Sequence, residues 1–335
     1  MNSLFIPEGY TPKLNRHDTQ LAIDCAKQAF QKEFSTSLEL RRVSAPLFVN
    51  STSGMNDNLS GTERPVDFDI PAIGINAEIV HSLAKWKRVA LKKYGFAVHE
   101  GLITDMNAIR RDEELDNLHS IYVDQWDWEK IINKEDRTTD YLKCVVTLIV
   151  NAVCNVNDKI KKKFPKLDTV ISRDISFITA QQLEDLYPDL TPQERENEYT
   201  KEHKTVFIMQ IGDKLNSGIP HGNRAPDYDD WSLNGDILVW NDVLGCAFEL
   251  SSMGVRVDKE SLESQLCKSG CEDRKSQPYH QMILNDELPL TIGGGIGQSR
   301  LCMLLLGCAH IGEVQSSLWD EETLSECKKH GIHLL

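Results

Sequence analysis

A glycine-rich stretch near the carboxyl end of the chain constrains the fold and the function more than any other segment. Four glycines occur between Thr291 and Arg300, and the apolar run 301–306 follows directly. Glycine has no Cβ, so the backbone here can pass close beneath a flat ligand, and an arginine at a helix start can contact phosphate or stack on an aromatic ring. The stretch therefore predicts a nucleotide site built from a glycine-rich turn and the helix that follows it.

Two other interpretations of this stretch have to be weighed. A dinucleotide-binding βαβ unit would need a third glycine where Arg300 stands, and too little chain follows for two mononucleotide-binding halves. The sequence has no GxxxxGK[ST] motif, which excludes a P-loop. A purely structural glycine turn is the simpler alternative, and only the other motifs of the chain can decide against it.

The acidic composition limits the classes of partner. Lys and Arg number 37 against 51 Asp and Glu, which gives a formal net charge of −14. This balance disfavours broad attraction to nucleic acid or to anionic membranes, although a small anion could still be held locally. No stretch approaches the roughly 20 apolar residues of a membrane span, and the amino terminus lacks a signal-peptide pattern. We expect a cytoplasmic protein without nucleic-acid or membrane partners.

The nine cysteines are scattered along the chain. An odd number without dense spacing predicts reduced thiols rather than a disulfide framework. Cys267 and Cys271 form a lone CxxxC, and without a second pair or a histidine at ligand spacing zinc binding is the weaker interpretation.

The hydrophobic pattern predicts a single domain over residues 15–335, preceded by an irregular amino-terminal arm over residues 1–14. Asp18 is expected to cap the first helix, Pro46 to end the first extended segment and Gly95 to stop the second helix. Helices are expected at 18–34, within 76–94 and at 140–163, and extended segments at 38–48, 101–110, 118–128, 207–211, 236–240 and 247–253.

The predicted strand 118–128 carries a polar pattern. Period-two alternation places Gln125 and Asp127 on one face and Asp124, Trp126 and Trp128 on the other. Acids between bulky aromatic residues are costly to bury without a partner, so the run predicts a polar pocket in a hydrophobic wall. An edge strand with solvated acids is the alternative.

Asp236 and Glu249 lie on successive predicted strands, and antiparallel pairing could bring the two carboxylates side by side. Mg²⁺ binds through one or two carboxylates together with substrate phosphates and water, so this pair could hold a metal–nucleotide complex. In the alternative, Asp236 ends a turn and Glu249 pairs with an arginine. Ser252 can join the face of Glu249 only if the strand bulges, since strict alternation places Ser251 there.

The order of these motifs resembles that of class II aminoacyl-tRNA synthetases: a helix and strand ending in Pro46, a strand–loop–strand carrying Arg110, and a GxGxxR turn carrying Arg300. More closely, segments 57–61, 80–88, 122–129 and 224–231, with the glycine-rich turn, look like the aspartate–ammonia ligase family, the ammonia-dependent asparagine synthetases. The resemblance covers nearly the whole chain after the first dozen residues.

The resemblance implies an α+β fold, an antiparallel β-sheet flanked by helices, and a homodimer built through the first motif. It also implies a reaction of ATP, Mg²⁺, L-aspartate and ammonia. The β-carboxylate of aspartate would attack the α-phosphate and release pyrophosphate, and ammonia would then displace AMP from the β-aspartyl-adenylate to give L-asparagine. Positioning and charge stabilisation, rather than a protein nucleophile, would carry this chemistry.

The same resemblance assigns the site residues. Arg110, Arg300 and Asp57 would be catalytic, with Arg110 on the α-phosphate and Arg300 on the nucleotide phosphates or the aspartate carboxylate. Aspartate would lie against Ser82, Lys87, Gln125, Asp127 and Ser252, with Lys87 facing a carboxylate and Asp57, Gln125 and Asp127 surrounding the ammonium group. ATP would lie against Asp229, Asp236, Glu249, Gly293, Gly294, Gly295 and Gly297, with Asp236 and Glu249 as the metal ligands. Apart from Lys87, most of the basic residues of the helix within 76–94 are expected to form a solvated face.

Two departures from the family pattern stand out. Ser232 passes directly to Leu233 where bacterial members carry a longer insertion, which could alter closure over ATP, and the segment before Arg224 is less basic. His221, in that segment, is therefore expected to be an ordinary loop histidine.

Three other functions compete with this one. A tRNA synthetase for aspartate or asparagine would need an anticodon domain of roughly 80–150 residues, for which we expect no room. A glutamine-hydrolysing asparagine synthetase would begin with a nucleophilic cysteine where Asn2 stands. A regulatory protein that keeps the fold and only senses its ligands would show degenerate motifs, whereas the candidate residues here are intact.

Overall fold

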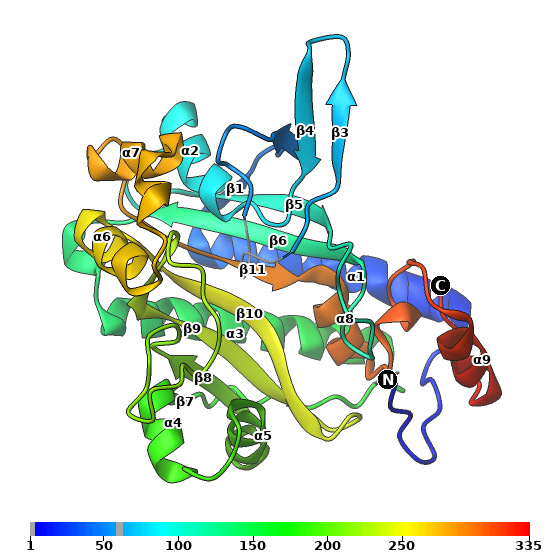
Figure 1. Cartoon of the computed structure of the whole chain (residues 1–335). Helices are drawn as coiled ribbons and strands as arrows, with labels where there is room; N and C mark the ends of the chain where they lie inside the picture. The colour runs from blue at the N-terminus through cyan, green and yellow to red at the C-terminus, as the bar shows by residue number, and fades with distance from the viewer. Residues whose placement is uncertain (1–3, 58–62) are drawn as a thin grey trace.

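An eight-stranded sheet forms the centre of the molecule (Figure 1). The computed structural model describes residues 4–57 and 63–335. The strand order is β1-β5-β6-β11-β10-β9-β8-β7. The strands are β1 (Leu40–Arg42), β5 (Gly101–Ile109), β6 (Tyr122–Ile131), β7 (Ser176–Thr179), β8 (Thr205–Met209), β9 (Asp229–Asn241), β10 (Cys246–Arg256) and β11 (Thr291–Gly297).

The sheet is mixed, which corrects the expectation of a purely antiparallel sheet. The five inner pairs from β5 to β8 are antiparallel, but β1 runs parallel to β5 and β7 runs parallel to β8. A parallel neighbour requires a crossover, and long segments that include helices precede both β5 and β8 in the chain. The antiparallel centre carries the candidate site.

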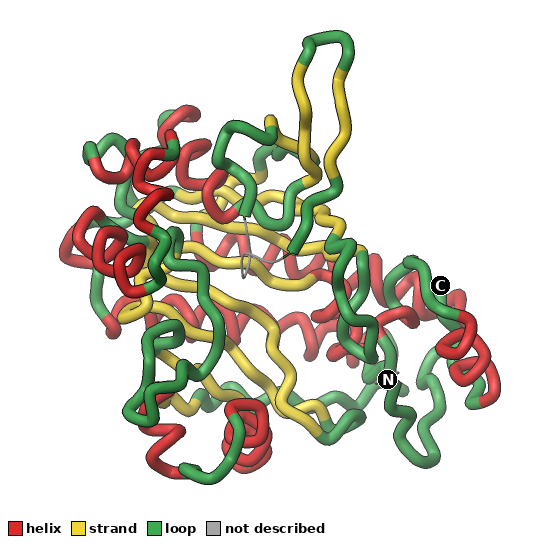
Figure 2. Tube along the Cα trace, in the orientation of Figure 1, coloured by secondary structure: helices red, strands yellow, loops and turns green. Residues whose placement is uncertain are grey.

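Helices cover one face of the sheet, while loops and shorter helices border the other (Figures 1 and 2). α1 and α3 lie side by side behind the strands, with α8 next to α1. The helices are α1 (Arg16–Leu38), α2 (Ala84–Tyr94), α3 (Thr139–Lys163), α4 (Ala180–Leu186), α5 (Pro192–His203), α6 (Lys259–Lys268), α7 (Pro278–Leu284), α8 (Gln298–Leu306) and α9 (Glu321–Lys329). Short 3₁₀ turns are η1 (Lys134–Asp136), η2 (Glu272–Ser276) and η3 (Ile311–Glu313).

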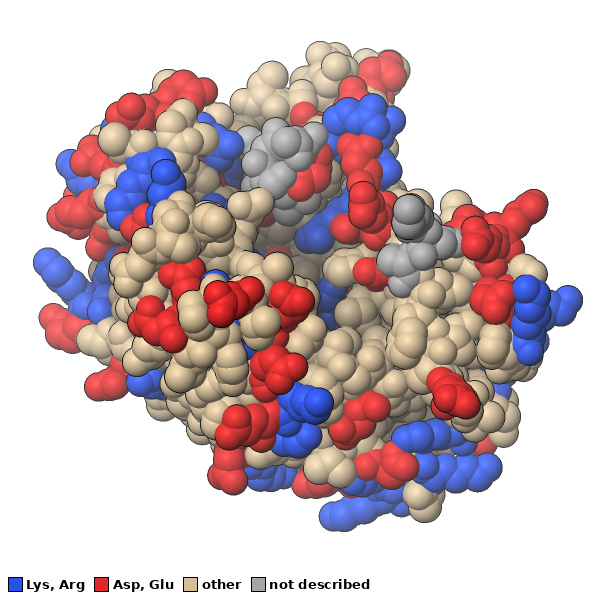
Figure 3. Space-filling model, turned by 60° about the horizontal axis from the view of Figure 1, so that its bottom comes forward, with Lys and Arg blue, Asp and Glu red and all other residues tan. Residues whose placement is uncertain are grey.

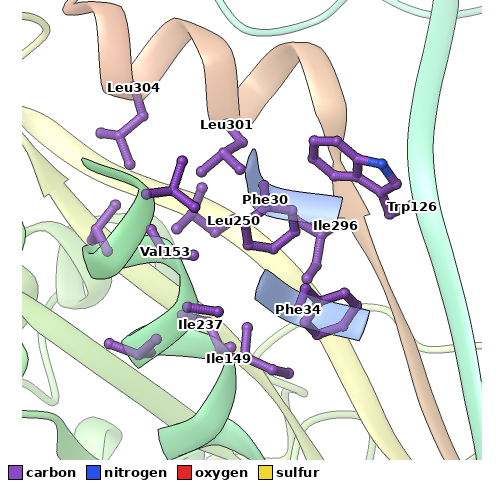
Figure 4. Close-up of a cluster of buried hydrophobic side chains, with 14 of the residues drawn as sticks. Phe30, Phe34, Trp126, Ile149, Val153, Ile237, Leu250, Ile296, Leu301 and Leu304 are labelled. Atoms are coloured by element: carbon purple, nitrogen blue, oxygen red, sulfur yellow. The ribbon is translucent and has the colours of Figure 1, made fainter. Parts of the chain in front are cut away.

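The main core lies between this helical layer and the sheet. α1 buries a residue every four positions, from Ala22 to Leu38, and this spacing keeps them on one face. Phe30 and Phe34 contact Trp126 and Trp128 of β6, with ring centroids 4.8 and 5.9 Å apart. Figure 4 shows this cluster continuing into α3, α8, β9, β10 and β11.

Helix boundaries differ from the expected ones at α1. The helix begins at Arg16 with Asn15 as its cap, whose side chain accepts the amide hydrogen of Asp18, and it ends at Leu38 rather than at residue 34. Asp18 had been expected as the cap, but Asn15 is an equally good cap residue and precedes it. The segment 38–48 is consequently a helix end and the short strand β1, not one extended run. At α2 the expected stop is confirmed, since Gly95 has a left-handed φ of 70°.

A second, three-stranded sheet projects from the molecule (Figure 1). Its strands are β2 (Phe48–Asn50), β3 (Asp67–Ile70) and β4 (Ile75–Ile79), in the order β2-β4-β3. Residues 58–61, which belong to one of the segments that resemble the ligase family, lie outside the described residues.

α3 passes a length and composition test for a membrane-crossing helix, which differs from the expectation that no segment would do so. Half of its most apolar window is buried within the fold, where it packs on α1 and the sheet. Core helices pass the same test, so this is weak evidence for a span. All nine cysteines lie in the described part of the chain and are free thiols, as expected.

Candidate active site

A cavity of about 910 Å³ lies above the open face of the central strands. This size is typical of a site for a small-molecule ligand. Figure 3 shows this side of the molecule hollowed near its centre, with basic side chains visible inside the hollow. Of the predicted site residues, the cavity is lined by Asp57, Ser82, Lys87, Arg110, Gln125, Asp127, Asp229, Glu249, Ser252, Gly294, Gly295, Gly297 and Arg300. Asp236 and Gly293 are the two predicted residues outside its lining.

β6 supplies the polar floor of the cavity. Gln125 and Asp127 face the cavity, while Trp126 and Trp128 are buried in the core on the opposite face. β6 lies between β5 and β11, so the alternative of a solvated edge strand is wrong. A Cβ on Gly295 of β11 would come within 2.6 Å of the Gln125 side chain and 2.7 Å of Asp127. Glycine at this position therefore leaves room for both polar side chains.

Acidic and basic side chains lie together at one end of the cavity. Lys87 of α2 is buried, donates to the carbonyl oxygen of Gly294 at 2.9 Å, and has its Nζ 3.3 Å from Asp127. Burial lowers the pKa of Lys87 below its ordinary value, although the Asp127 charge acts in the opposite direction. Ser82 donates to Asp57 at 2.8 Å. This end presents two carboxylates and one ammonium, a combination that suits a zwitterionic amino acid.

A buried ion cluster beneath the cavity was missed by the sequence analysis. Arg256 of β10 donates to Glu129 of β6 at 2.8 and 3.0 Å and also pairs with Asp229. Both Arg256 and Glu129 are almost completely buried, and Arg256 also lines the cavity. Burial alone would raise the pKa of Glu129, but the Arg256 charge outweighs it and the pKa is lowered. Alternation from Ser252 through residue 254 to Arg256 on one strand face was the signal that could have identified this arginine.

Gly293 belongs to this cluster and not to the cavity wall, which changes its expected role. A Cβ at this position would overlap the Glu129 carboxylate and lie 2.7 Å from the Arg256 guanidinium. The glycine therefore makes room for the Glu129–Arg256 pair. The stretch itself is strand β11 leading directly into α8, and not the turn that its glycines suggested.

The two predicted catalytic arginines lie at the other end of the cavity. Arg110 follows β5 and has its Nη1 3.7 Å from Glu113, while its buried Nε has no hydrogen-bond partner among the described residues. Arg300 is in the first turn of α8 and donates to the carbonyl oxygen of Glu249 at 3.2 Å. Both guanidinium groups thus retain capacity to bind an anion in the cavity.

The first turn of α8 is fixed by Asp124, on the back face of β6. Its carboxylate accepts the amide hydrogen of Ser299 at 3.0 Å and the Ser299 hydroxyl at 2.8 Å. Lys27 of α1 donates to the same carboxylate at 2.9 Å, and Gln315 at 3.2 Å. A carboxylate at a helix amino terminus stabilises that end of the helix. The bonds hold the residue immediately before Arg300.

A β-bulge places Ser252 on the cavity face together with Glu249. A bulge was the condition that the sequence set for these two residues to share a face. The pairing of β10 with β9 shifts between Glu249 and Ser251, so that Ser252 lies opposite Asp236 and Glu249 opposite Leu238. Asp236 and Glu249 therefore lie diagonally across the neighbouring strands β9 and β10 and not directly opposite each other. Ser251 is buried on the other side.

Asp236 is paired with a loop arginine that had no predicted role. Arg224 forms a salt bridge with Asp236, and its buried Nε has no hydrogen-bond partner among the described residues. Burial, together with the charge of Glu249, raises the pKa of Asp236 to about 7 against the opposing effect of Arg224.

The three acidic residues that follow Arg224 are buried, and each is paired with basic side chains. The pairs are Asp227 with Lys85 and Arg274, Asp229 with Arg256, and Asp230 with Arg137. His221 is also buried and lies 2.9 Å from Glu196.

The donor set around Asp236 and Glu249 fits Mg²⁺. Among the described residues no cluster of three or more His, Cys, Asp or Glu side chains could enclose a metal alone. Mg²⁺ does not need such a cluster, because it is usually held by one or two carboxylates, substrate phosphates and water. Glu249 is exposed, with the Arg300 guanidinium 3.9 Å away, whereas Asp236 is buried and bonded to Arg224.

Comparison with solved structures identifies the class of fold first. An asparaginyl-tRNA synthetase from Pyrococcus horikoshii complexed with asparaginyl-adenylate superposes with a TM-score of 0.66 at 14% identity, covering 91% of this chain and 70% of that chain. An aspartyl tRNA synthetase from Entamoeba histolytica gives a TM-score of 0.60 at 17% identity, covering 91% of this chain and 59% of that one. The fold is that of the catalytic domain of class II aminoacyl-tRNA synthetases.

Sequence comparison then defines the family. A profile described as aspartate–ammonia ligase matches residues 17–331. The aspartate–ammonia ligase of Ruminiclostridium cellulolyticum is 58% identical over 336 residues, covering 100% of both chains, and that of Levilactobacillus brevis is 58% identical over 333 residues, covering 99% of each. This chain belongs to the aspartate–ammonia ligase family and is a ligase of asparagine biosynthesis.

Proposed function

We propose that the chain joins L-aspartate to ammonia in two steps through a β-aspartyl-adenylate, with ATP as the second substrate and AMP and pyrophosphate as products. The observation that carries this proposal is the division of one cavity into two chemically different ends. Asp57, Lys87 and Asp127 lie at one end, and Arg110 and Arg300 lie at the other. A zwitterionic amino acid and a polyphosphate would meet between them.

In the first step the β-carboxylate oxygen of aspartate forms a bond to the α-phosphorus while the bond to pyrophosphate breaks. Lys87 and the buried Arg256 would hold the carboxylates of aspartate, and Asp57, Gln125 and Asp127 would hold its ammonium group. Arg110 and Arg300 would offset the charge that develops on the α-phosphate oxygens. The protein supplies alignment and charge, so a nucleophilic side chain is not needed.

In the second step the nitrogen of ammonia attacks the acyl carbon, the bond to the phosphate oxygen breaks, and AMP leaves with that oxygen. The nitrogen loses a proton, and L-asparagine results. A Mg²⁺ ion held by Asp236 and Glu249 would neutralise phosphate charge when it is bound. Arg224, freed from Asp236, would then be able to contact phosphate itself.

The proposal also includes assembly and location. We infer a cytoplasmic homodimer that forms through the segment from α1 to Pro46, without nucleic acid or membrane as partners. In this proposal residues 15–335 form one catalytic domain, and residues 1–14 form the amino-terminal arm.

The test is product analysis with purified protein, aspartate, ATP, Mg²⁺ and an ammonium salt. Equal amounts of asparagine, AMP and pyrophosphate are expected, and a parallel reaction with glutamine in place of ammonium defines the nitrogen donor. Formation of ADP would contradict the adenylate mechanism. ATP binding without asparagine formation would favour a protein that only senses its ligands.

A further inference from the structure

The loop between β5 and β6 forms a wall at the arginine end of the cavity. Glu113, His119 and Ser120 of this loop line the cavity, together with Arg110 at its beginning. One hydrogen bond joins the two ends of the loop: the amide of Arg110 donates to the carbonyl oxygen of Ile121 at 2.8 Å. Between these points Arg64 pairs with Asp112, and the Ser120 hydroxyl bonds the Ser317 hydroxyl at 2.9 Å. A separate set of contacts holds the outer side of the loop.

Asn117 holds that outer side to the amino-terminal segment. Its side-chain oxygen accepts the amide hydrogen of Phe5 at 2.7 Å, and its Nδ2 donates to the carbonyl oxygen of Phe5 at 2.6 Å. The same Nδ2 donates to the carbonyl oxygen of Ala309 at 2.8 Å, and the carbonyl oxygen of Asn117 accepts from Ile311 at 2.8 Å. Asn117 is only 6% exposed, so these bonds replace water almost entirely. Figure 1 shows the amino-terminal segment beside this loop.

The contact joins three distant parts of the chain next to the cavity. Leu118 and Ile311, which flank the Asn117 contacts, both line the cavity. Phe5 is 53% exposed, so it meets the loop through its backbone bonds to Asn117 and not through burial of its ring. Further along, Tyr10 fixes the segment by donating to Glu313 at 2.9 Å. The family profile begins at residue 17 and does not include this segment.

We propose that the amino-terminal segment positions the nucleotide-binding loop, and that Asn117 is the positioning residue through which it acts. Pairing with both backbone groups of Phe5 fixes Asn117 in the way that a neighbouring strand would, and the loop residues that line the cavity are thereby held in one arrangement. A loop that is already ordered binds ATP without the entropic cost of being ordered first. This inference rests on the proposed function, which places the nucleotide at this end of the cavity.

The experiment compares the full chain with a shortened chain from which residues 2–6 are removed and with Asn117→Asp. The shortened chain loses both bonds to Phe5, together with the packing of Leu4 and Ile6 on the Ala309 cluster, but keeps Asn117 and its bond to Ala309. Asn117→Asp leaves Leu4 and Ile6 in place and therefore separates the two losses. Asn117→Asp keeps the size and one acceptor but replaces both N–H donors by an oxygen that faces carbonyl groups. Lys13→Met is the matched control, because it removes the Lys13–Asp168 ion pair elsewhere on the same segment.

Two readouts are needed for each protein: the Kd of Mg·ATP by calorimetry without aspartate, and the KM values for ATP and aspartate in the asparagine assay. We expect the Kd and KM for ATP to rise about tenfold in both variants, as the loss of one or two hydrogen bonds that order a loop would cause. The KM for aspartate should change by less than about twofold, and Lys13→Met should match the full chain. A general loss of structure would raise both KM values together.

An ATP affinity in the shortened chain equal to that of the full chain would overturn the proposal, as would a parallel rise in both KM values. Calorimetry measures ATP binding without turnover, so failure of this proposal can be told apart from failure of the proposed function. If the full chain forms no asparagine but the variants still bind ATP more weakly, the loop is positioned as proposed and the catalytic assignment is wrong.

Discussion

In the proposed mechanism, single residues supply the charge at the arginine end of the cavity. Arg300 reaches the cavity from the first turn of α8, and a planar guanidinium can bond two phosphate oxygens at once. A lysine at this position keeps the charge but loses the paired donors. The position therefore separates the contribution of geometry from that of charge.

Arg300→Lys should lower kcat/KM for ATP about 100-fold, which corresponds to roughly 2.7 kcal/mol of transition-state stabilisation. The measurement is the steady-state rate of AMP formation, with the melting temperature as the check on folding. Arg173→Lys is the control, because Arg173 is exposed and does not line the cavity. Unchanged turnover in Arg300→Lys would remove Arg300 from the mechanism.

The face on which a side chain lies was predictable along one strand, whereas the pairing of residues on different strands was not. Alternation along β6 correctly separated Gln125 and Asp127 from the two tryptophans, because facing depends only on the period of the strand. The Glu129–Arg256 pair joins β6 and β10 beneath β11, so recognising it requires the register of three strands. A single sequence does not specify that register.

Elements place the site residues, and α8 shows how. Asp124 fixes the first turn of α8 through both the amide and the hydroxyl of Ser299. The helix boundaries of α1 were harder to predict because Asn15 and Asp18 are both competent caps. The sequence showed that Ser252 can face the cavity only if β10 contains a bulge, but it did not predict that the bulge is present.

Asp124→Asn should destabilise the protein by about 1–3 kcal/mol, because it weakens a buried charge-assisted network with Lys27 and the helix terminus. It should also lower turnover, because Arg300 follows the residue that Asp124 holds. Urea unfolding and the AMP assay measure the two effects. Asp24→Asn on the exposed face of α1 provides the control. Full activity in a destabilised Asp124→Asn protein would limit Asp124 to a structural role.

The segment around η3 should make stability depend on pH through His310. Burial lowers the pKa of His310 to about 4, its Nδ1 accepts the amide hydrogen of Gly312 at 3.0 Å, and its ring contacts Trp319. The unfolded chain takes up a proton near pH 6.5 but the folded chain does not, so stability is present above pH 6.5 and is lost as the pH falls toward 4. Between pH 7.5 and 5 the loss should be about 2 kcal/mol.

The comparison is urea unfolding of the natural protein and of His310→Asn at both pH values. The asparagine oxygen can accept the same amide hydrogen but does not titrate in this range. The free-energy difference between the two proteins should shrink at pH 5 by the amount that His310 contributes. An equal loss in both proteins would show that other groups cause the pH dependence.

The whole molecule combines a class II synthetase fold with a cavity that we propose as the site of amide formation. Its fold class was predictable because the three motifs occur in order along the chain, while the parallel edge strands β1 and β7 were not. Edge pairing depends on crossovers whose path the sequence pattern does not show.

The proposed homodimer gives a prediction at this scale. Light scattering coupled to gel filtration should give twice the chain mass of 38.0 kDa. Leu47 and Phe48, next to Pro46, are about half exposed in the isolated chain, and association through this segment would cover them. Leu47→Glu should then shift the mass to that of one chain, whereas Leu318→Glu, at an exposed residue far along the sequence, should not. A single-chain mass for the unaltered protein would contradict the dimer.

Formation of a β-aspartyl-adenylate leaves a trace in the oxygen atoms of the products. L-aspartate labelled with ¹⁸O in its β-carboxylate is converted with ATP and ammonia, and the products are analysed by mass spectrometry. Each AMP formed should carry one labelled oxygen, because the carboxylate oxygen bonds to the α-phosphorus and stays there when ammonia attacks. Unlabelled AMP, or label in inorganic phosphate with formation of ADP, would contradict it.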